Sequence, residues 1–154
     1  MPTLIRKDEG FLIPDGPYLC HIASIKITTW KQSDPASDPC YEIDWMIDEA
    51  TRDNEEWVGK LVRFTRMGLA KNTTTVQKMV DAIAGNDTPL GMEILLDDEP
   101  FDTEDYERLM ERPVGVNFEQ RHWEKAGKSG TQNDFRKGEP FFPAYLWDSY
   151  RENL

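Results

Sequence analysis

Residues 41–48 read YEIDWMID, and this stretch decides the fold class. Apolar or aromatic residues occupy the four odd positions, and acidic residues occupy three of the four even positions. A period of two is typical of a β-strand with two different faces, whereas a helix repeats about every 3.6 residues. The pattern therefore predicts a strand with a mostly acidic face and an apolar face that buries Ile43, Trp45 and Ile47.

Further strands are expected on both sides of this stretch. Residues 18–30, YLCHIASIKITTW, are rich in β-branched and aromatic side chains and contain no glycine or proline, so they predict a long first strand. Residues 57–68 predict a third strand, in which Val62 and Phe64 share one side. Residues 114–121 alternate again and predict a fourth strand.

Two helices are expected between the third and fourth strands. Residues 76–83 place apolar side chains at i, i+3, i+4 and i+7, after a cap at residue 72 or 73 and before a stop at Gly85. A shorter helix is expected from residue 102 or 103, with acidic residues in its first turn, and it ends before Pro113.

The C-terminal part completes the predicted fold. AGKSG at 126–130 predicts a hairpin or a longer loop, followed by a fifth, edge-like strand around residues 131–137. Three strands, a helical insertion and two strands follow the order of an OB-fold, a five-stranded Greek-key β-barrel. We expect a single domain over residues 1–154, with its core at 11–143 and a short tail at 144–154.

Composition limits the classes of function. The 154 residues carry a formal net charge of −11, which argues against indiscriminate attraction to nucleic acid or to an anionic membrane. Residues 32–58 and residues 87–112 each have a net charge of −8, so the rest of the chain is weakly positive.

The sequence shows no secretory signal and no apolar run near the roughly 18 residues of a spanning helix, so we expect a cytoplasmic protein. Cys20 and Cys40 are expected to be free and buried.

Several short motifs resemble those of one protein family. They are Gly16-Pro17-Tyr18, YEIDWMID, VGKLV at 58–62, AIAG at 82–85, an acidic linker with Phe101 and Asp102, PVGV at 113–116, and a basic strand leading to Phe142 and Pro143. With these motifs the sequence is similar to short bacteriophage-encoded OB-fold proteins of a domain-of-unknown-function family, described as single-stranded DNA-binding proteins. The resemblance implies a role in DNA replication or recombination in a bacterial host cell and supplies no catalytic residues. The tail WDSYRENL departs from the acidic tails of such proteins, because its charge is only −1.

Single-strand binding needs cations that follow the phosphates and exposed aromatic faces on which bases stack. Trp30 and Trp123 are the expected stacking residues, although both could instead fold onto the core. Trp57 fits either position. The expected cationic contacts lie on or near the strands; they are Lys26, Lys60, Arg63, Arg66, Arg121, Lys125, Lys128, Arg136 and Lys137. We therefore expect a non-enzymatic protein that binds single-stranded DNA with little sequence preference. Replication or recombination proteins and a second copy of the chain are further candidate partners.

Motifs for catalysis, metals and cofactors are weak, and none is expected to act. GKSG at 127–130 fails as a phosphate loop because His122 stands where that motif requires glycine. Neither His21 nor His122 has a zinc ligand at the usual spacing. The acidic run at 97–105 lacks the spacing of a calcium loop, but it could contact a partner or mask the binding groove.

Two other classes of function remain open. The first is an acidic protein-interaction module, a phage factor that presents its two acidic segments to a basic host protein as a DNA mimic does. The second is a divalent-metal nuclease, suggested faintly by Asp15 with Glu124 and Lys125.

Overall fold

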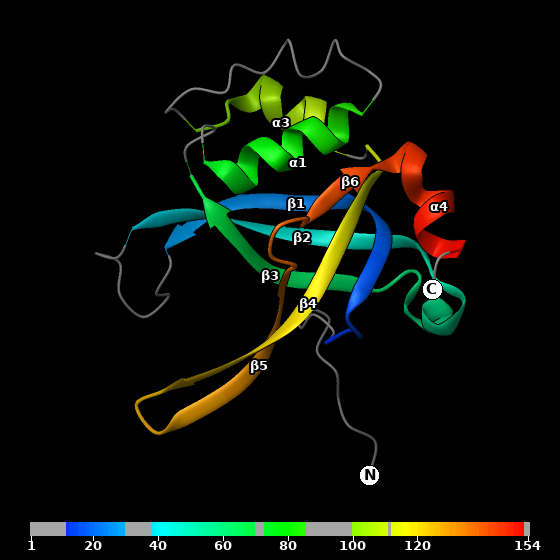
Figure 1. Ribbon diagram of the computed structural model, residues 1–154. Helices are drawn as coiled ribbons and strands as arrows, with labels where there is room; N and C mark the ends of the chain where they lie inside the picture. The colour runs from blue at the N-terminus through cyan, green and yellow to red at the C-terminus, as the bar shows by residue number, and fades with distance from the viewer. Residues whose placement is uncertain (1–11, 30–37, 70–72, 86–99, 111, 153–154) are drawn as a thin grey trace.

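The computed structural model describes residues 12–29, 38–69, 73–85, 100–110 and 112–152, and it is mainly β. Six antiparallel strands form one open sheet in the order β3-β2-β1-β4-β5, with β6 paired to β4 (Figure 1). The strands are β1 (Gly16–Thr29), β2 (Pro39–Ala50), β3 (Leu61–Gly68), β4 (Val114–Lys125), β5 (Lys128–Phe135) and β6 (Phe141–Pro143). The prediction of a mainly β chain is confirmed, and β6 is a strand that the sequence pattern does not predict.

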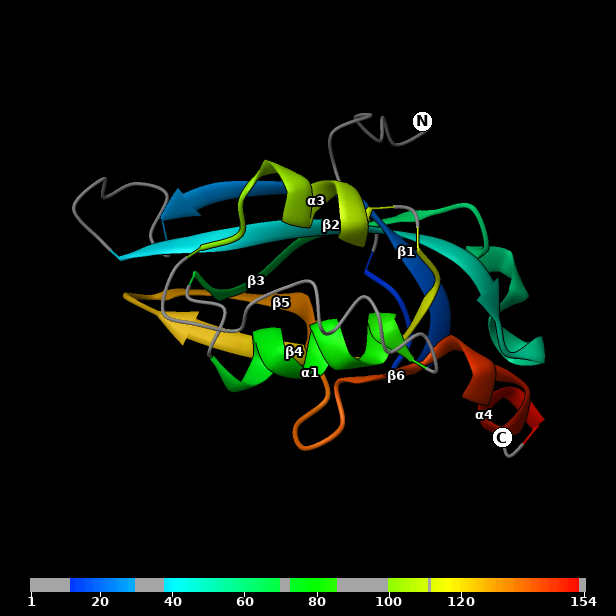
Figure 2. The ribbon, with the colours of Figure 1, turned by 90° about the horizontal axis from the view of Figure 1, so that it is seen from above.

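Helices cover one end of the sheet. Figure 2 shows α1 (Thr74–Ala84) and α3 (Thr103–Leu109) together over that end. The other helices among the described residues are η1 (Arg52–Trp57), η2 (Ala144–Leu146) and α4 (Trp147–Glu152). In the part of the chain that the structure describes, no helix has the length and apolarity needed to cross a membrane.

The first strand serves two neighbours. Its first five residues pair with β4, from Gly16 opposite Phe118 to Cys20 opposite Val114. Nearly the whole strand pairs with β2 on the other side, with register shifts after Leu19 and after Ile22. These irregularities accompany the strong bend of β1 in Figure 1, because a bulge adds twist and bends the strand.

The alternation in residues 41–48 is confirmed on its apolar side. Ile43, Trp45 and Ile47 are fully or almost fully buried. The indole nitrogen of Trp45 donates a 2.9 Å hydrogen bond to Thr65 Oγ1, so its one polar group is satisfied inside the core. Trp57 is partly buried against this core, and both cysteines are free and buried as expected.

The third strand differs from its predicted pattern. It begins at Leu61 and not at Trp57, because η1 and a turn at Gly59 (φ 83°) precede it. Val62 is buried whereas Phe64 is exposed, so the expectation that they share a side is wrong. The pairing of β2 with β3 shifts between Ile43 and Trp45, and this bulge reverses the alternation.

Both predicted helices are present at the expected places. Thr73 and Gly85 flank α1, whose apolar residues are buried. The side chain of Asp102 accepts from the backbone of Asp105, and the reverse bond completes a capping box for α3. Phe101 is buried and stacks on Tyr41 with centroids 5.1 Å apart, so its ring is not available to a partner. Residues 97–99 of the acidic run lie outside the described residues.

The predicted hairpin is also present, and it forms an arm. Ala126 and Gly127 turn the chain with positive φ values of 52° and 79°, as a tight hairpin turn requires. The strand after the turn starts at Lys128, three residues earlier than predicted. Figure 1 shows the outer parts of β4 and β5 projecting from the body of the protein; we call residues 119–134 the hairpin arm.

The C-terminal segment folds back onto β4. A side chain at Gly115 would collide with the ring of Phe142, because an added Cβ would lie 2.1 Å from that ring. The same ring stacks on Tyr150 with centroids 3.7 Å apart, and Trp147 is buried beside it. Residues 144–152 are therefore a packed helical segment.

Candidate nucleic-acid interface

A row of charged residues crosses the first three strands. Lys26, Glu42 and Arg66 stand directly opposite one another in the register of β1, β2 and β3. Lys26 Nζ lies 2.8 Å from one oxygen of Glu42, and Arg66 lies 3.4 Å from the other. Glu42 is only 1% exposed, although it belongs to the acidic side of its strand. Two cations therefore share one carboxylate, which leaves this row with one net positive charge.

A second buried carboxylate organises the bulge. Asp44, which is 7% exposed, accepts a hydrogen bond from Ser24 Oγ at 3.1 Å. It also accepts from Arg63 Nε at 3.1 Å and from the backbone N–H of Phe64 at 3.3 Å. The Arg63 guanidinium carbon in turn lies 4.7 Å from the centroid of the Phe64 ring. Arg63 is thus a paired and oriented cation, and it differs in this respect from the exposed phosphate contact that the sequence predicts.

A hollow of about 230 Å³ opens between β3, the N-terminal turn of α1, and β5 with the loop that follows it. Its charged lining consists of five cations and one carboxylate. They are Arg66, Lys78, Arg121, Arg136 and Lys137, with Asp134. We call this site the cationic hollow. It concentrates positive charge at one place on a protein whose formal net charge is −11.

Two of these cations are held in place by other groups. Arg121 lies 3.4 Å from carboxylate oxygens of both Glu119 and Asp134. Lys78 Nζ donates to the backbone carbonyl of Gly138 at 2.9 Å, a contact that leaves its charge unneutralised. Arg136 is exposed on the rim of the hollow. The local excess of positive charge therefore comes mainly from Lys78, Arg136 and Lys137, with a share from the Lys26–Glu42–Arg66 row.

The N-terminus of α1 adds to this positive potential. Thr74 and Thr75 line the hollow, and the first turn of α1 contains no acidic residue. The first turn of α3, by contrast, is filled by Glu104 and Asp105. Backbone N–H groups at a helix N-terminus favour anions, so α1 presents an end suited to a phosphate beside the cations. The close contact of Thr73 with Gly68 holds that end against β3.

The hairpin arm carries the second group of predicted residues. Trp123 is 41% exposed, which agrees with its predicted outward position, and its indole lies against Gly130 of the paired strand. Lys128 is exposed next to the turn. Trp30 lies outside the described residues, as does the side chain of Lys125.

The structure brings together only some of the predicted contacts. Arg66, Arg121, Arg136 and Lys137 gather in the hollow. Lys26 does not line it, but shares the carboxylate of Glu42 with Arg66. Lys60 precedes β3, at the end of that strand remote from Arg66. The sequence reasoning missed Lys78, because the search for cations followed the strands, and it missed Phe64, because the bulge moves that ring outward.

Comparison with known proteins identifies no relative of this chain. No family model and no curated protein matches this chain. Among the described residues, no three His, Cys, Asp or Glu side chains gather closely enough to hold a metal ion.

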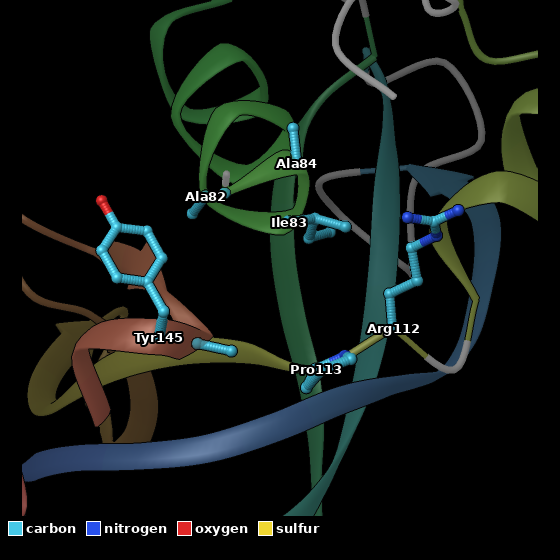
Figure 3. A pocket seen from close by; sticks show the side chains of 8 residues that line it. Ala82, Ile83, Ala84, Arg112, Pro113 and Tyr145 are labelled. Atoms are coloured by element: carbon cyan, nitrogen blue, oxygen red, sulfur yellow. The ribbon is translucent and has the colours of Figure 1, made fainter. Parts of the chain in front are cut away.

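A second hollow, of about 250 Å³, lies at the opposite end of α1 and differs in chemistry. Figure 3 shows Ala82, Ile83, Ala84, Pro113 and Tyr145 around it, with Arg112 at its side. Its lining is mostly apolar, so it offers little to a phosphate chain. Tyr145 is 58% exposed there, which makes it an aromatic residue well suited to serve as a control for those near the cationic hollow.

Proposed function

We propose that this protein is a non-enzymatic single-stranded DNA-binding protein whose phosphate-binding groove is the cationic hollow. The observation that carries the proposal is the charge of the lining, five cations against one carboxylate, on a strongly acidic chain. A nucleic-acid strand is attracted to such a site and repelled by the rest of the surface, which restricts the path of the strand.

The strand arrangement supports an OB-type fold as part of the same proposal. OB-folds are partly open barrels that bind oligonucleotides on the face of strands 2 and 3 and with the loops after strands 1 and 4. In this chain the corresponding region of β2 and β3 holds Phe64, Glu42 and Arg66, and the connection after β4 is the turn of the hairpin arm. The sheet is open between β3 and β5, where the cationic hollow lies.

The aromatic residues support a single strand over a duplex. Phe64 is 48% exposed, and Trp123 stands on the hairpin arm. Stacking on such rings requires unpaired bases and is tolerant of sequence, since every base has a π-face. The role in phage DNA replication or recombination is also proposed, and it rests on the family resemblance of the sequence.

The alternative of an acidic DNA mimic has less support. A mimic must expose its carboxylates to a basic partner. Among the carboxylates on β2 of the first acidic segment, Glu42 and Asp44 are instead buried in ion pairs. Asp48 and Glu49 are partly exposed, but they pair with His21 and Arg151.

Fluorescence anisotropy of a labelled oligothymidine tests the proposal. If about four phosphates are neutralised, the logarithm of affinity falls with a slope of about −2.8 against log salt, or about 50-fold between 50 and 200 mM. Absence of binding even at low salt would remove the proposed function. Release of shortened oligonucleotide in the presence of Mg²⁺ would favour the nuclease instead.

A further inference from the structure

Phe64 combines two properties that are unfavourable for a purely structural residue. Its backbone lies in the left-handed region, with φ 70°, where bulky side chains are rarely found. Its ring is 48% exposed, so it gains only part of the stabilisation that burial provides. Glycine would fit this backbone without strain, and a polar residue would suit the exposure better. Non-glycine residues in strained conformations cluster at binding and catalytic sites.

The surroundings of Phe64 hold it in this conformation. The backbone N–H of Phe64 donates to the carboxylate of Asp44, which is buried and lies on the neighbouring strand. Ser24 and Arg63 donate to the same carboxylate, so residues of three strands meet at one charge. Asp44 thereby fixes both the bulge and the position of the exposed ring.

Arg63 lies against the ring of Phe64, and we call these two residues the platform. Its guanidinium carbon lies 4.7 Å from the ring centroid of Phe64, within the range of a cation–π contact. Because Asp44 already neutralises the charge of Arg63, the planar guanidinium is better suited to back the ring than to bind a phosphate.

The platform is continuous with the cationic hollow. Arg66, which lines the hollow, stands two residues after Phe64 on β3. Two residues of a strand span about 7 Å, a distance comparable with one extended nucleotide. A base on Phe64 would therefore leave its own backbone within reach of the cations.

We propose that Phe64, backed by Arg63 and positioned by Asp44, is the stacking subsite for one unpaired nucleobase. This inference rests on the proposed function and deepens it, because it assigns the base contact to a residue that strict alternation places on the side of the buried Val62. The hollow then binds the phosphates, and Phe64 selects strands whose bases are free.

Phe64→Leu tests the subsite, since leucine is apolar but cannot stack. A stacked base is worth about 1–3 kcal/mol, so affinity for oligothymidine should fall about 5-fold to 150-fold. Phe64→Trp should bind at least as tightly as the original protein. Tyr145→Leu, which removes a comparably exposed ring at the other end of α1, should leave affinity unchanged.

An oligomer of the same length made of abasic sugar-phosphate units separates stacking from phosphate binding. Phe64→Leu should bind this abasic strand as well as the original protein does. Asp44→Asn should likewise lower affinity for the strand with bases relative to affinity for the abasic strand, whereas general damage to the fold would lower affinity for both strands by the same factor.

The outcomes distinguish the two proposals. If the original protein binds neither strand at low salt, the proposed function itself fails. If it binds oligothymidine and Phe64→Leu binds as tightly as Tyr145→Leu, only the stacking subsite is overturned. Equal losses of Phe64→Leu on the two strands would also overturn it, because the change would then act through the phosphates.

Discussion

Replacing Asp44 by asparagine should destabilise the fold far more than the same change at Asp48. The asparagine side chain would keep one carbonyl oxygen, which can accept from the backbone N–H of Phe64. Its NH2 group would replace the carboxylate oxygen that accepts from Ser24 and Arg63, so the charge that faces Arg63 would be lost. The Arg63 side chain is only 16% exposed, so its charge would be left with little solvent to replace the carboxylate.

The expected magnitude follows from this burial. Removing one partner of a fully buried pair costs about 3–5 kcal/mol, whereas an exposed pair contributes about 0–1 kcal/mol. The Asp44–Arg63 pair is nearly buried and therefore resembles the buried pair more than the exposed one. We expect Asp44→Asn to lower the free energy of unfolding by about 2–3 kcal/mol. The Asp48–His21 pair is partly exposed at both ends, so Asp48→Asn should cost less than about 1 kcal/mol.

Equilibrium unfolding in urea measures both variants. With a slope of about 2 kcal/mol per M, Asp44→Asn should lower the midpoint by roughly 1 to 1.5 M, and Asp48→Asn by less than about 0.5 M. Adding Arg63→Gln to Asp44→Asn should restore part of the loss, since no uncompensated charge then remains. Equal midpoint shifts for Asp44→Asn and Asp48→Asn would refute the inference that Asp44 is a buried charge whose ion pair stabilises the fold.

Three further changes probe the backbone and the packing. Gly115→Ala forces the ring of Phe142 to move and should lower thermal stability by about 1–3 kcal/mol; an unchanged melting temperature would contradict that contact. Phe64→Gly should be more stable than Phe64→Ala by about 1 kcal/mol in urea unfolding, because φ is 70°; the reverse order would argue against the strained conformation. Burial of Tyr150, and its hydrogen bond to Glu139, raise the pKa of this tyrosine to about 12. The pKa of an unfolded tyrosine is near 10, so this stabilisation is present below pH 10 and is lost as pH rises toward 12. Tyr150→Phe should make stability less dependent on pH in this range, and an unaltered pH profile would contradict the contact.

Features encoded by local spacing could be predicted from the sequence. The apolar side of β2 and the apolar stripe of α1 repeat at periods of two and about 3.6, and both are buried as predicted. Gly85 ends α1 as predicted, because a glycine stop acts within one turn of the helix. Thr73 stands at the N-cap position as predicted, but its side chain makes no capping hydrogen bond.

Features that depend on strand register could not be predicted in this way. Alternation assigns Glu42 and Asp44 to the side away from the core, but cannot reveal that cations of β1 and β3 stand opposite them and cover them. A strict period of two places Phe64 on the side of Val62 because it assumes an uninterrupted strand, and the bulge opposite Asp44 adds the residue that breaks this period.

The missed parts of the site and of the C-terminus have similar causes. Lys78 resembles any exposed helix residue until α1 is placed beside the loop that carries Gly138. Trp147 and Tyr150 stand three residues apart, which is a helical spacing that could have indicated a packed turn. Their contact with Phe142 depends on the absence of a side chain at Gly115, far away in the sequence.

A matched pair of charge changes tests whether the cationic hollow binds the strand. Arg136→Gln removes a cation that lines the hollow, and Arg52→Gln removes an exposed cation of η1, which lies before the start of β3. Both changes alter the net charge by one unit, so a general electrostatic effect acts on them equally. We predict that Arg136→Gln lowers oligothymidine affinity in anisotropy titrations and reduces the salt slope by about 0.7, whereas Arg52→Gln changes neither quantity. Equal effects of the two substitutions, or no effect of either on a protein that binds the strand, would contradict the assignment of the hollow as the phosphate-binding groove.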